Sequence, residues 1–314
     1  MMVSSTVSSN GQKLSDLIKV LTPLYDASNK NDEFENIIIS DIADDSRLVG
    51  PGTLFIARSG NDTHGERFIS AAIKNGAVAI LRQTTEISES DTKNTISIKW
   101  ITTAINKSIP EIFISFSNKN LSNLAVSFYK NPSAKMQVVG ITGTNGKTSC
   151  AYILANLINI KQKCGFIGTI GRGDINALVE TDNTTQGVVE NQKILAEMYG
   201  NGFKQVVMEV SSHALTQQRI DGVDINCAVF TNLTHDHLDY HQSFENYGNA
   251  KLELFKLSSL NSAVLNVDDA FSEKILDVIS DSVTVITYGI ENQSAELVAE
   301  IIEYRINSTL VKIK

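Results

Sequence analysis

Three of the chain's five histidines, His235, His237 and His241, stand within the sequence THDHLDYH (residues 234–241), together with Asp236. Imidazole and carboxylate groups at this density indicate a metal site, and zinc is the first hypothesis because it takes both kinds of ligand. The three cysteines are odd in number and form no C-x-x-C pair, so they offer zinc no paired thiolates. Which ion is held therefore depends on the chemistry that the rest of the chain offers.

The sequence GITGTNGKTS (residues 140–149) lies between a β-like run and a helical pattern, where a phosphate-binding loop must lie. Glycines let the backbone turn its N–H groups toward phosphate oxygens, and the following helix adds the partial positive charge of its N-terminus. Lys147 can reach the β- and γ-phosphates, and the Thr148 hydroxyl can bind Mg²⁺. The commoner spacing has glycine in place of Ile141, and the alternative is a chance glycine-rich turn. The motif predicts ATP as the ligand.

Glu209 lies inside the apolar run VVMEV (residues 206–210), where an unpaired carboxylate would be costly. A nucleotide in a phosphate loop needs Mg²⁺, and this ion prefers oxygen ligands and water. We therefore predict that Glu209 serves the metal or its water. The alternative is an acid at a strand end that faces solvent.

Lys251 lies in the middle of an apolar helical stripe with Phe244, Tyr247 and Leu254, in a helix that Ser243 would cap. One interpretation is an ammonium group in water with only its stem covered. The other is a partly buried amine whose pKa has fallen, so that it is neutral part of the time. Such an amine can combine with CO₂ to form a carbamate, which is an anionic oxygen ligand suited to a second Mg²⁺.

Strand-like and helical segments alternate along the chain, which predicts the α/β class with a mostly parallel sheet in the second half. A helix stop at Asn131-Pro132 separates a small α/β domain, residues 1–134, from a phosphate-loop domain, residues 135–314. The predicted strands are residues 36–40, 53–57, 77–81, 95–101, 137–142, 206–210, 227–232, 262–267 and 283–289, and the predicted helices are residues 12–25, 66–76, 120–136, 151–158 and 244–255.

The net charge of −8 and the pI near 5.2 argue against a nucleic-acid partner, which would favour a basic excess. No apolar run approaches the roughly 18 residues that a membrane span needs, and the polar start lacks the core of a signal peptide. Unpaired cysteines fit a reducing compartment. We expect no membrane insertion and a cytoplasmic location.

Several motifs occur together in the order and spacing of one enzyme family. They are GITGTNGKTS (140–149), NTTQ (183–186), MEVSSHALTQQR (208–219), FTNLTHDHLDYH (230–241) and YGNAKLELF (247–255), with DDSRLVGPGTLFIARSGNDTHGERF (44–68) in the first domain. From about residue 38 to its end, the chain resembles the Mur ligases of peptidoglycan synthesis, in particular the branch that adds a diamino acid. His64 departs from the pattern, because the family usually has aspartate there.

The resemblance implies a role for each matching residue. ATP would bind Gly143, Thr144, Asn145, Gly146, Lys147, Thr148 and Ser149. Mg²⁺ would be held or oriented by Thr148, Glu209, His237 and Lys251 as N6-carboxylysine, and the catalytic groups would be Lys147, Glu209, His237 and Lys251. The uridine diphosphate would contact Asp44, Ser46 with its neighbour Arg47, Asn61, Asp62 and Thr63, and the muramoyl peptide would contact Asn183, Thr184, Thr185, Ser211, Gln217 and Arg219.

The other histidines receive different roles. His235 and His241 are expected to be hydrogen-bonding or surface residues, and His213 is expected to shape the substrate loop. Only His237 is expected to be a metal ligand, so the resemblance answers the opening question with magnesium and not zinc.

The resemblance also implies an activity: a monomeric, ATP-dependent ligase that joins a diamino acid, meso-diaminopimelate before L-lysine, to UDP-MurNAc-L-Ala-D-Glu through an acyl phosphate. Family members carry a third, C-terminal domain that closes over ATP, and this chain ends before it, so we expect no amide formation by the chain alone. The alternatives are a nucleotide-binding fragment without turnover, another ligase of the superfamily such as a folylpolyglutamate synthase, and a zinc hydrolase.

Overall fold

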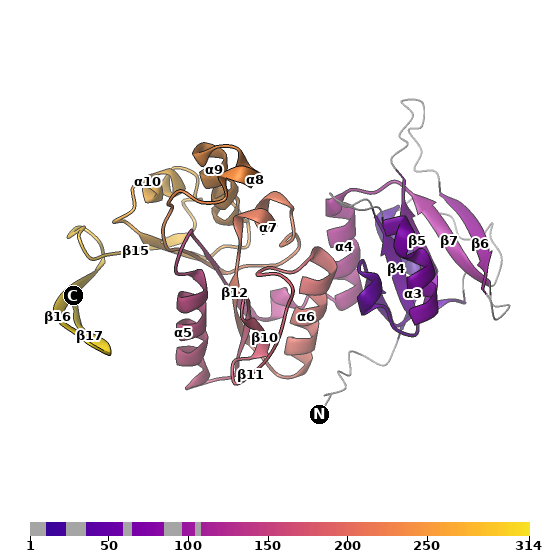
Figure 1. Cartoon of the computed structure of the whole chain (residues 1–314), viewed down its shortest axis with the longest axis horizontal. Helices are drawn as coiled ribbons and strands as arrows, with labels where there is room; N and C mark the ends of the chain where they lie inside the picture. Colours follow the sequence, from indigo (N-terminus) through magenta and orange to yellow (C-terminus); the bar gives the residue numbers. More distant parts are fainter. Residues whose placement is uncertain (1–10, 23–35, 59–64, 85–95, 104–107) are drawn as a thin grey trace. The chain divides into compact units, whose positions relative to one another are not determined.

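The computed structural model describes residues 11–22, 36–58, 65–84, 96–103 and 108–314. The chain divides into two compact units: residues 1–131 with 188–197, and residues 132–187 with 198–314. Both units combine helices with mostly parallel sheets (Figure 1), so the predicted α/β class is confirmed. No helix within the described ranges is long and apolar enough to cross a membrane.

The first unit is built on a five-stranded sheet in the order β3-β4-β5-β7-β6. The strands β3, β4, β5 and β7 are parallel, and β6 pairs antiparallel with β7. The bounds are β3 (Asp41–Ala43), β4 (Thr53–Ala57), β5 (Ala77–Gln83), β6 (Ser97–Thr102) and β7 (Ser108–Ile114). The run at 53–57 forms a strand over its predicted bounds. Of the run at 36–40, only β2 (Ile38–Ile39) is a strand, and it pairs with β1 (Gln12–Lys13).

Three predicted helices of the first unit are present. They are α1 (Leu14–Leu21), α3 (Ile69–Asn75), which follows the 3₁₀ turn η3 (Gly65–Phe68), and α4 (Asn118–Tyr129). Helix α1 buries the expected apolar stripe against α4, and Ser117 caps α4 by accepting a hydrogen bond from the Asn120 N–H. Helix α4 ends where Lys130 and Asn131 take positive φ angles of 60° and 43°. The helix stop before Pro132 is therefore confirmed.

Helix α3 ends at Gly76, as the sequence predicts. Gly76 has a φ of +113°, and a Cβ atom there would meet the Pro51 Cα at 2.9 Å. We expect Gly76→Ala to lower the free energy of unfolding of the first unit by about 1–3 kcal/mol, because alanine is strained in this conformation. Urea unfolding followed by the fluorescence of Trp100, the chain's single tryptophan, measures this change. Gly50→Ala is the control, since a Cβ at Gly50 would meet nothing within 4 Å; an equal loss in both variants would contradict the expectation.

Helix α6 (Val188–Gly200) was not predicted, and its first ten residues pack with the first unit. Val188 and Val189 are 5% and 2% exposed and belong to the core that contains α1 and α4. Lys193 pairs with Asp41 of β3 at 2.5 Å, and the Tyr129 hydroxyl donates to the same carboxylate at 2.6 Å. The predicted boundary after residue 134 placed residues 188–197 in the second domain. A single boundary cannot describe a chain in which a later segment returns to the first core.

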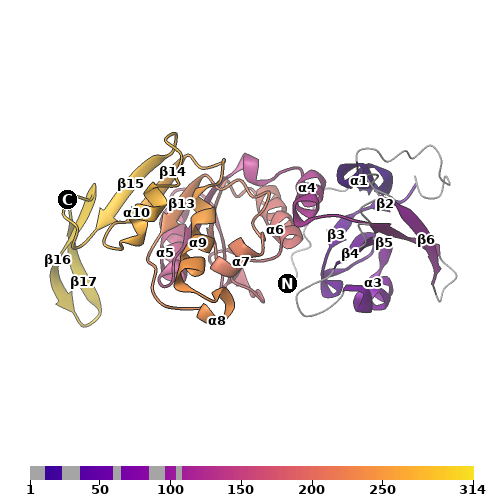
Figure 2. The ribbon, with the colours of Figure 1, turned by 90° about the horizontal axis from the view of Figure 1, so that it is seen from above.

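The second unit contains a ten-stranded sheet in the order β11-β10-β9-β12-β8-β13-β14-β15-β16-β17. In this sheet order, the seven strands β9, β12, β8, β13, β14, β15 and β16 run parallel. At one end β10 pairs antiparallel with β9 and β11, and at the other β17 pairs antiparallel with β16. The bounds are β8 (Gln137–Thr142), β9 (Cys164–Gly168), β10 (Gly171–Asp174), β11 (Ala177–Val179), β12 (Gln205–Glu209), β13 (Cys227–Phe230), β14 (Ser262–Asn266), β15 (Thr284–Gly289), β16 (Leu297–Arg305) and β17 (Ser308–Ile313). Figure 2 shows β13, β14 and β15 side by side, with the β16–β17 hairpin beyond them.

The helices of the second unit are α5 (Lys147–Asn159), α7 (Ser212–Thr216), α8 (Leu238–His241), α9 (Phe244–Phe255) and α10 (Phe271–Leu276). Helix α5 covers one face of the sheet, where Ala151 and Ala155 pack against Ile141, Phe166 and Val207. Parallel strands end at one edge of a sheet, and ligands bind outside those carboxyl ends. The segments after β8, β12 and β13 contain the phosphate loop, the end of VVMEV and the histidine motif, so this edge is where the predicted site residues gather.

Candidate functional site

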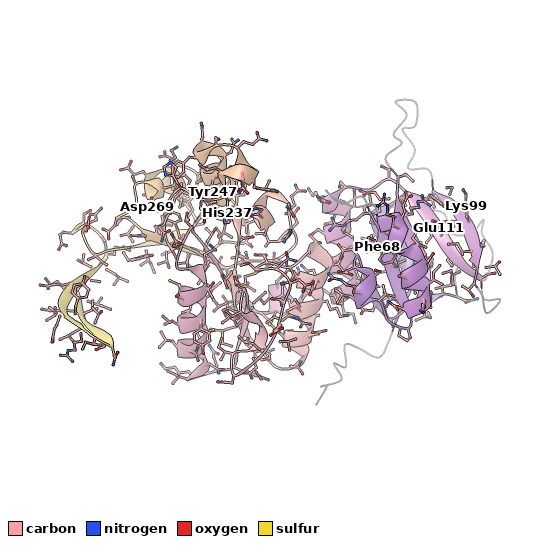
Figure 3. All side chains as sticks on the ribbon, in the orientation of Figure 1. Phe68, Lys99, Glu111, His237, Tyr247 and Asp269 are labelled. Carbon is pink, nitrogen blue, oxygen red and sulfur yellow. The ribbon has the colours of Figure 1, made fainter. Side chains whose placement is uncertain are left out.

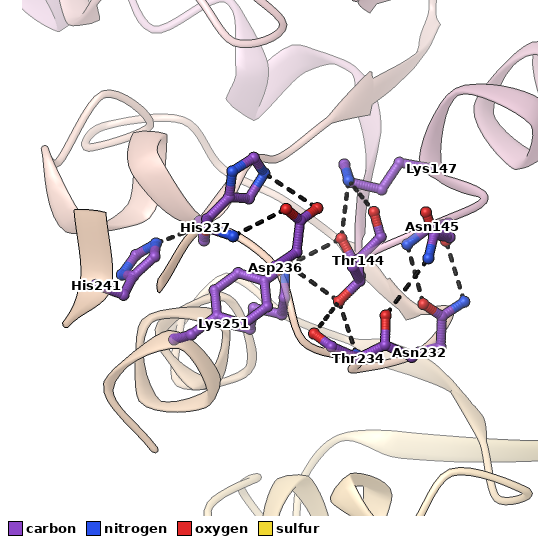
Figure 4. A network of polar contacts seen from close by, with 12 residues as sticks. Thr144, Asn145, Lys147, Asn232, Thr234, Asp236, His237, His241 and Lys251 are labelled. Atoms are coloured by element: carbon purple, nitrogen blue, oxygen red, sulfur yellow. Dashed lines mark hydrogen bonds and ion pairs between the residues drawn. The ribbon is translucent and has the colours of Figure 1, made fainter. Parts of the chain in front are cut away.

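The phosphate loop connects β8 to α5 and has the backbone that its glycines allow. Gly143 and Gly146 take φ angles of +148° and +83°, and Gly146 is the N-cap of α5. The Lys147 ammonium donates to the carbonyl oxygens of Gly143 and Thr144 at 2.8 and 2.9 Å (Figure 4). Burial lowers the pKa of Lys147, and the charges of Glu209 and Asp236 act in the opposite direction. The lysine thus folds back over the loop that it is predicted to serve.

Residues after β13 support the loop from outside. The Thr144 N–H donates to the Asn232 carbonyl at 2.8 Å, and the Asn145 N–H donates to the Asn232 side-chain oxygen at 2.9 Å. The Thr231 hydroxyl donates to the Asn145 carbonyl at 2.7 Å. These bonds satisfy polar groups of the loop and fix its path.

Glu209 is fully buried at the end of β12, so the interpretation of a solvent-facing acid is wrong. Its carboxylate accepts a hydrogen bond from the Thr148 hydroxyl at 2.7 Å and another from the Thr169 N–H at 2.8 Å. A side chain at Gly168 would collide with the same carboxylate. The Thr169 hydroxyl also donates to this carboxylate, at 3.3 Å. The acid is therefore aimed at the first turn of α5, next to the phosphate loop, and three donors stabilise its charge.

Lys251 is also buried, at 1% exposure, which excludes the interpretation of an ammonium in water. Its helix α9 begins after the N-cap Ser243, whose hydroxyl accepts from the Asn246 N–H. The Lys251 ammonium donates to the Gly143 carbonyl at 3.0 Å and lies 4.4 Å from the ring centroid of Tyr247. Burial, and then the charge of Lys147, lower the pKa of Lys251 to about 7. The amine is therefore neutral for part of the time near neutral pH.

The histidines have distinct surroundings. His241 is 6% exposed, and its Nε2 lies 2.9 Å from the Ser212 hydroxyl. His235 stacks on Phe244, with ring centroids 4.6 Å apart. His237 has a φ of +52°, is about half exposed, and lies 3.6 Å from the Asp236 carboxylate. His235 is exposed and His241 has a hydrogen-bond partner, which agrees with the expectation of surface or hydrogen-bonding residues.

His213 joins the histidine motif to the rest of the cluster. Its ring lies 4.1 Å from Tyr240, 5.0 Å from His237 and 5.5 Å from His241, measured between centroids. Burial lowers the pKa of His213 and of His241, and neighbouring positive charges act in the same direction. Within the described ranges, no group of three or more histidine, cysteine or acidic side chains is arranged to hold a metal ion.

One cavity of about 330 Å³ brings most of the second-unit site residues together. Its lining contains Lys147, Thr148, Asn183, Thr184, Thr185, Glu209, Ser211, His213, Arg219, His237, Tyr247 and Lys251. Figure 3 shows His237 and Tyr247 close together in this region. The cavity holds cations, hydroxyls and one buried acid, so it suits an anionic, phosphate-bearing ligand.

Arg219 lies at the wall of this cavity, and Gln217 holds its guanidinium. The Arg219 guanidinium donates to the Thr185 carbonyl at 3.0 Å and to the Gln217 side-chain oxygen at 2.7 and 2.9 Å. The Thr185 hydroxyl in turn donates to the Glu209 carbonyl at 2.9 Å. These contacts tie the segment at 183–185 to the end of β12.

The predicted uridine residues belong to the first unit. Asp44 pairs with Arg58 at 2.9 Å, Ser46 begins the 3₁₀ turn η2 (Ser46–Leu48), and Arg47 pairs with Asp45. Asn61, Asp62, Thr63 and His64 lie outside the described residues.

Three residues that line the cavity were not predicted to have a role in the site: Thr169, Ser212 and Tyr247. Thr169 follows β9 and donates to Glu209, and no local pattern in the sequence indicates this contact. Tyr247 lines the cavity, although its place on the apolar stripe of α9 suggested packing alone. Its spacing of four residues from Lys251 is the signal that could have identified it.

The chain is similar to known proteins along most of its length. A family profile described as the Mur ligase middle domain matches residues 141–314, and one described as Mur ligase family, catalytic domain, matches residues 39–122. A UDP-N-acetylmuramoyl-L-alanyl-D-glutamate--2,6-diaminopimelate ligase of Coxiella burnetii is 36% identical over 285 residues, 90% of this chain and 55% of that protein. The ligase of the same name from Chromobacterium violaceum is 42% identical over 249 residues, 79% of this chain and 48% of that protein. The chain thus spans about half the length of these relatives.

Solved structures give the same result. A structure of a UDP-N-acetylmuramoyl-L-alanyl-D-glutamate--2,6-diaminopimelate ligase matches with a TM-score of 0.71 and 27% identity, over 94% of this chain and 56% of that one. MurF from Acinetobacter baumannii matches with a TM-score of 0.65 and 16% identity, over 95% of this chain and 57% of that one, which shows the fold alone. With the middle-domain profile covering more than half of its length, the chain belongs to the Mur ligase family.

Proposed function

We propose that the chain carries the ATP site and the uridine-substrate site of an ATP-dependent amide ligase of peptidoglycan synthesis in the cytoplasm. The reaction would add diaminopimelate, in our proposal the meso form, to UDP-MurNAc-L-Ala-D-Glu. The names of the relatives give 2,6-diaminopimelate and UDP-N-acetylmuramoyl-L-alanyl-D-glutamate for those proteins. The observation that carries the proposal is one cavity that joins the phosphate-loop residues Lys147 and Thr148 to the buried Glu209 and Lys251. A ligase that forms an acyl phosphate needs cations and oxygen ligands of this kind around the transferred phosphate.

The residues present fit a magnesium ion next to the nucleotide. Thr148 and Glu209 offer a hydroxyl and a carboxylate that already meet at 2.7 Å, and Mg²⁺ is usually held by one or two carboxylates together with phosphate oxygens. When bound, the ion would neutralise charge on the β- and γ-phosphates. Lys147 would leave the Gly143 and Thr144 carbonyls and donate to the phosphates instead.

The proposed reaction has two steps, phosphoryl transfer and amide formation. An oxygen of the substrate γ-carboxylate attacks the γ-phosphorus of ATP, the bond to the β–γ bridging oxygen breaks, and ADP leaves. The amine nitrogen of the diamino acid then attacks the acyl carbon, phosphate leaves, and the amine loses a proton. The chain's contribution is to position the phosphates through the loop backbone, Lys147 and Ser149.

Lys251 has the properties that carbamate formation requires. A neutral amine attacks CO₂, a C–N bond forms, and one proton is released. A lysine with a pKa of about 7 is neutral far more often than an exposed one. The resulting carboxylate, with His237, would offer ligands to a second Mg²⁺, which is the role that we propose for both residues.

The function is tested with the purified chain and its proposed ligands. We expect calorimetry to detect binding of ATP·Mg²⁺ and of UDP-MurNAc-L-Ala-D-Glu, and Lys147→Met to remove the first and leave the second. Mass spectrometry of mixtures with each diamino acid then shows whether this chain completes the amide, and which amine it takes. Absence of both binding events would refute the proposal, and binding without product would favour a nucleotide-binding fragment.

The uridine site in the first unit gives a separate prediction. We expect Ser46→Ala to weaken binding of UDP-MurNAc-L-Ala-D-Glu about fivefold, because one hydrogen bond of ordinary net strength is lost. ATP·Mg²⁺ binding should not change, since every residue of the ATP loop lies in the second unit. Ser108→Ala, at the exposed start of β7, is the matched control. Equal substrate affinity in wild type and Ser46→Ala would show that Ser46 does not contact the uridine nucleotide.

A further inference from the structure

Tyr247 contacts the phosphate loop although it lies more than one hundred residues away in the sequence. It is 1% exposed, and its hydroxyl lies 3.0 Å from the Thr144 hydroxyl. Burial raises the pKa of Tyr247, the hydrogen bond with Thr144 acts against this, and the charge of Asp236 adds to it. The phenol therefore keeps its proton and is available as a donor, and a buried phenol usually has a hydrogen-bond partner.

The proton arrangement around Thr144 follows from its neighbours. The Thr144 hydroxyl accepts from the Thr234 N–H at 2.9 Å and can donate its one proton to the Thr234 carbonyl at 3.3 Å. The phenol of Tyr247 then donates to the same oxygen, and every group is satisfied. Thr144 is thus held from two sides, by the segment after β13 and by helix α9.

The aromatic ring of Tyr247 contacts Lys251. The Lys251 ammonium lies 4.4 Å from the Tyr247 ring centroid and donates to the carbonyl of Gly143, the residue before Thr144. Figure 4 shows Lys251, Thr144 and Thr234 within this one network. Tyr247 and Lys251, one helical turn apart, therefore hold adjacent residues of the loop from the same face of α9.

We propose that Tyr247 is a positioning residue that fixes the Gly143–Thr144 segment of the phosphate loop through the Thr144 hydroxyl. This inference rests on the proposed function, because it assumes that the loop binds ATP. In this role Tyr247 acts through the Thr144 hydroxyl. Its loss changes the orientation of the loop carbonyls and N–H groups and leaves the core in place.

The test uses the whole chain and calorimetry with ATP·Mg²⁺. We expect Tyr247→Phe, which keeps the ring, to weaken binding about fivefold, the factor that one hydrogen bond of ordinary net strength gives. Tyr129→Phe is the matched control: Tyr129 is another buried tyrosine, its hydroxyl donates to Asp41 at 2.6 Å, and it lies in the first unit. We expect this control to bind ATP·Mg²⁺ like wild type.

A structural effect is separated from positioning by variants of Thr144. Thr144→Val removes the hydroxyl and should lose at least as much affinity for ATP·Mg²⁺ as Tyr247→Phe. Adding Tyr247→Phe to Thr144→Val should cause no further loss, because Thr144→Val already removes the bond between the Tyr247 and Thr144 hydroxyls. Two results would overturn the inference while the proposed function stands. One is a double variant whose loss of affinity equals the product of the two single losses, and the other is an unchanged affinity in Tyr247→Phe. A wild-type chain that does not bind ATP·Mg²⁺ would overturn both.

Discussion

Replacing Lys251 with methionine is expected to stabilise the second unit at pH 6 by a few kcal/mol. Lys251 is 1% exposed and its pKa is lowered to about 7 by burial and by Lys147. In the unfolded chain a lysine has a pKa of about 10.4, and each unit of difference corresponds to roughly 1.4 kcal/mol. Folding below pH 7 therefore places a charged ammonium in surroundings that disfavour it, and methionine fills a similar volume without that cost.

The pH dependence has a definite sign. Between about pH 7 and pH 10.4 the unfolded chain holds the Lys251 proton and the folded chain does not, so the stability of the wild type rises with pH in this window. The free energy of unfolding of Lys251→Met lacks this rise with pH. Its excess over the free energy of unfolding of the wild type should therefore shrink steadily from pH 7 to pH 10. Below pH 7 both states are protonated, and this excess should be constant.

Urea unfolding in CO₂-free buffer, followed by far-ultraviolet circular dichroism, measures the effect. Trp100 fluorescence reports the first unit separately, because the chain has one tryptophan and it lies in β6. Lys256→Met is the matched control, since Lys256 ends the same helix and is exposed beside Glu253. It should change stability little at any pH. An advantage of Lys251→Met that stays the same from pH 6 to pH 10 would show that the amine is not held as described.

The strands and helices that the sequence predicted are those with strong local periodicity. The runs at 53–57 and 137–142 form strands over their predicted bounds, and helix α9 follows its predicted cap. The hairpin β10–β11 was missed because its short strands begin with the glycine-rich sequence GRGD. The place of α6 was missed because only tertiary packing determines which core a helix joins.

The parts of the site that lie within a single sequence motif could be predicted, and contacts between distant segments could not. The phosphate loop and the acid in VVMEV are local patterns, and both have the predicted place. The surroundings of Lys251 are not local, because the Gly143 carbonyl that accepts its hydrogen bond lies 108 residues away. The same holds for Thr148 and Glu209, which are 61 residues apart. Sequence periodicity placed Lys251 on an apolar face, but only the packed structure distinguishes a buried amine from an exposed one.

Glu209→Gln is expected to remove the magnesium dependence of ATP binding. The amide keeps the size of the side chain and can still accept from the Thr169 N–H and bond with the Thr148 hydroxyl. It loses the negative charge that a Mg²⁺ ion beside Thr148 would use. Loss of one ligand or its supporting group commonly costs about 10–100-fold in metal affinity. We expect ATP to bind about 10–100-fold more weakly than to wild type when Mg²⁺ is present.

The metal-free measurement makes the prediction specific. With a chelator present, the Glu209 carboxylate can only repel the phosphates, so Glu209→Gln should bind free ATP as tightly as wild type or more tightly. When the metal is removed, the ATP affinity of Glu209→Gln should therefore equal or exceed that of wild type. Glu253→Gln is the control, because Glu253 is an exposed acid on α9 and its loss should leave both affinities unchanged. Calorimetry with and without Mg²⁺ on these three proteins is the measurement. Magnesium that strengthens ATP binding by the same factor in wild type and Glu209→Gln would place the ion elsewhere, and Glu209 would then serve only to hold Thr148 and Thr169 in position.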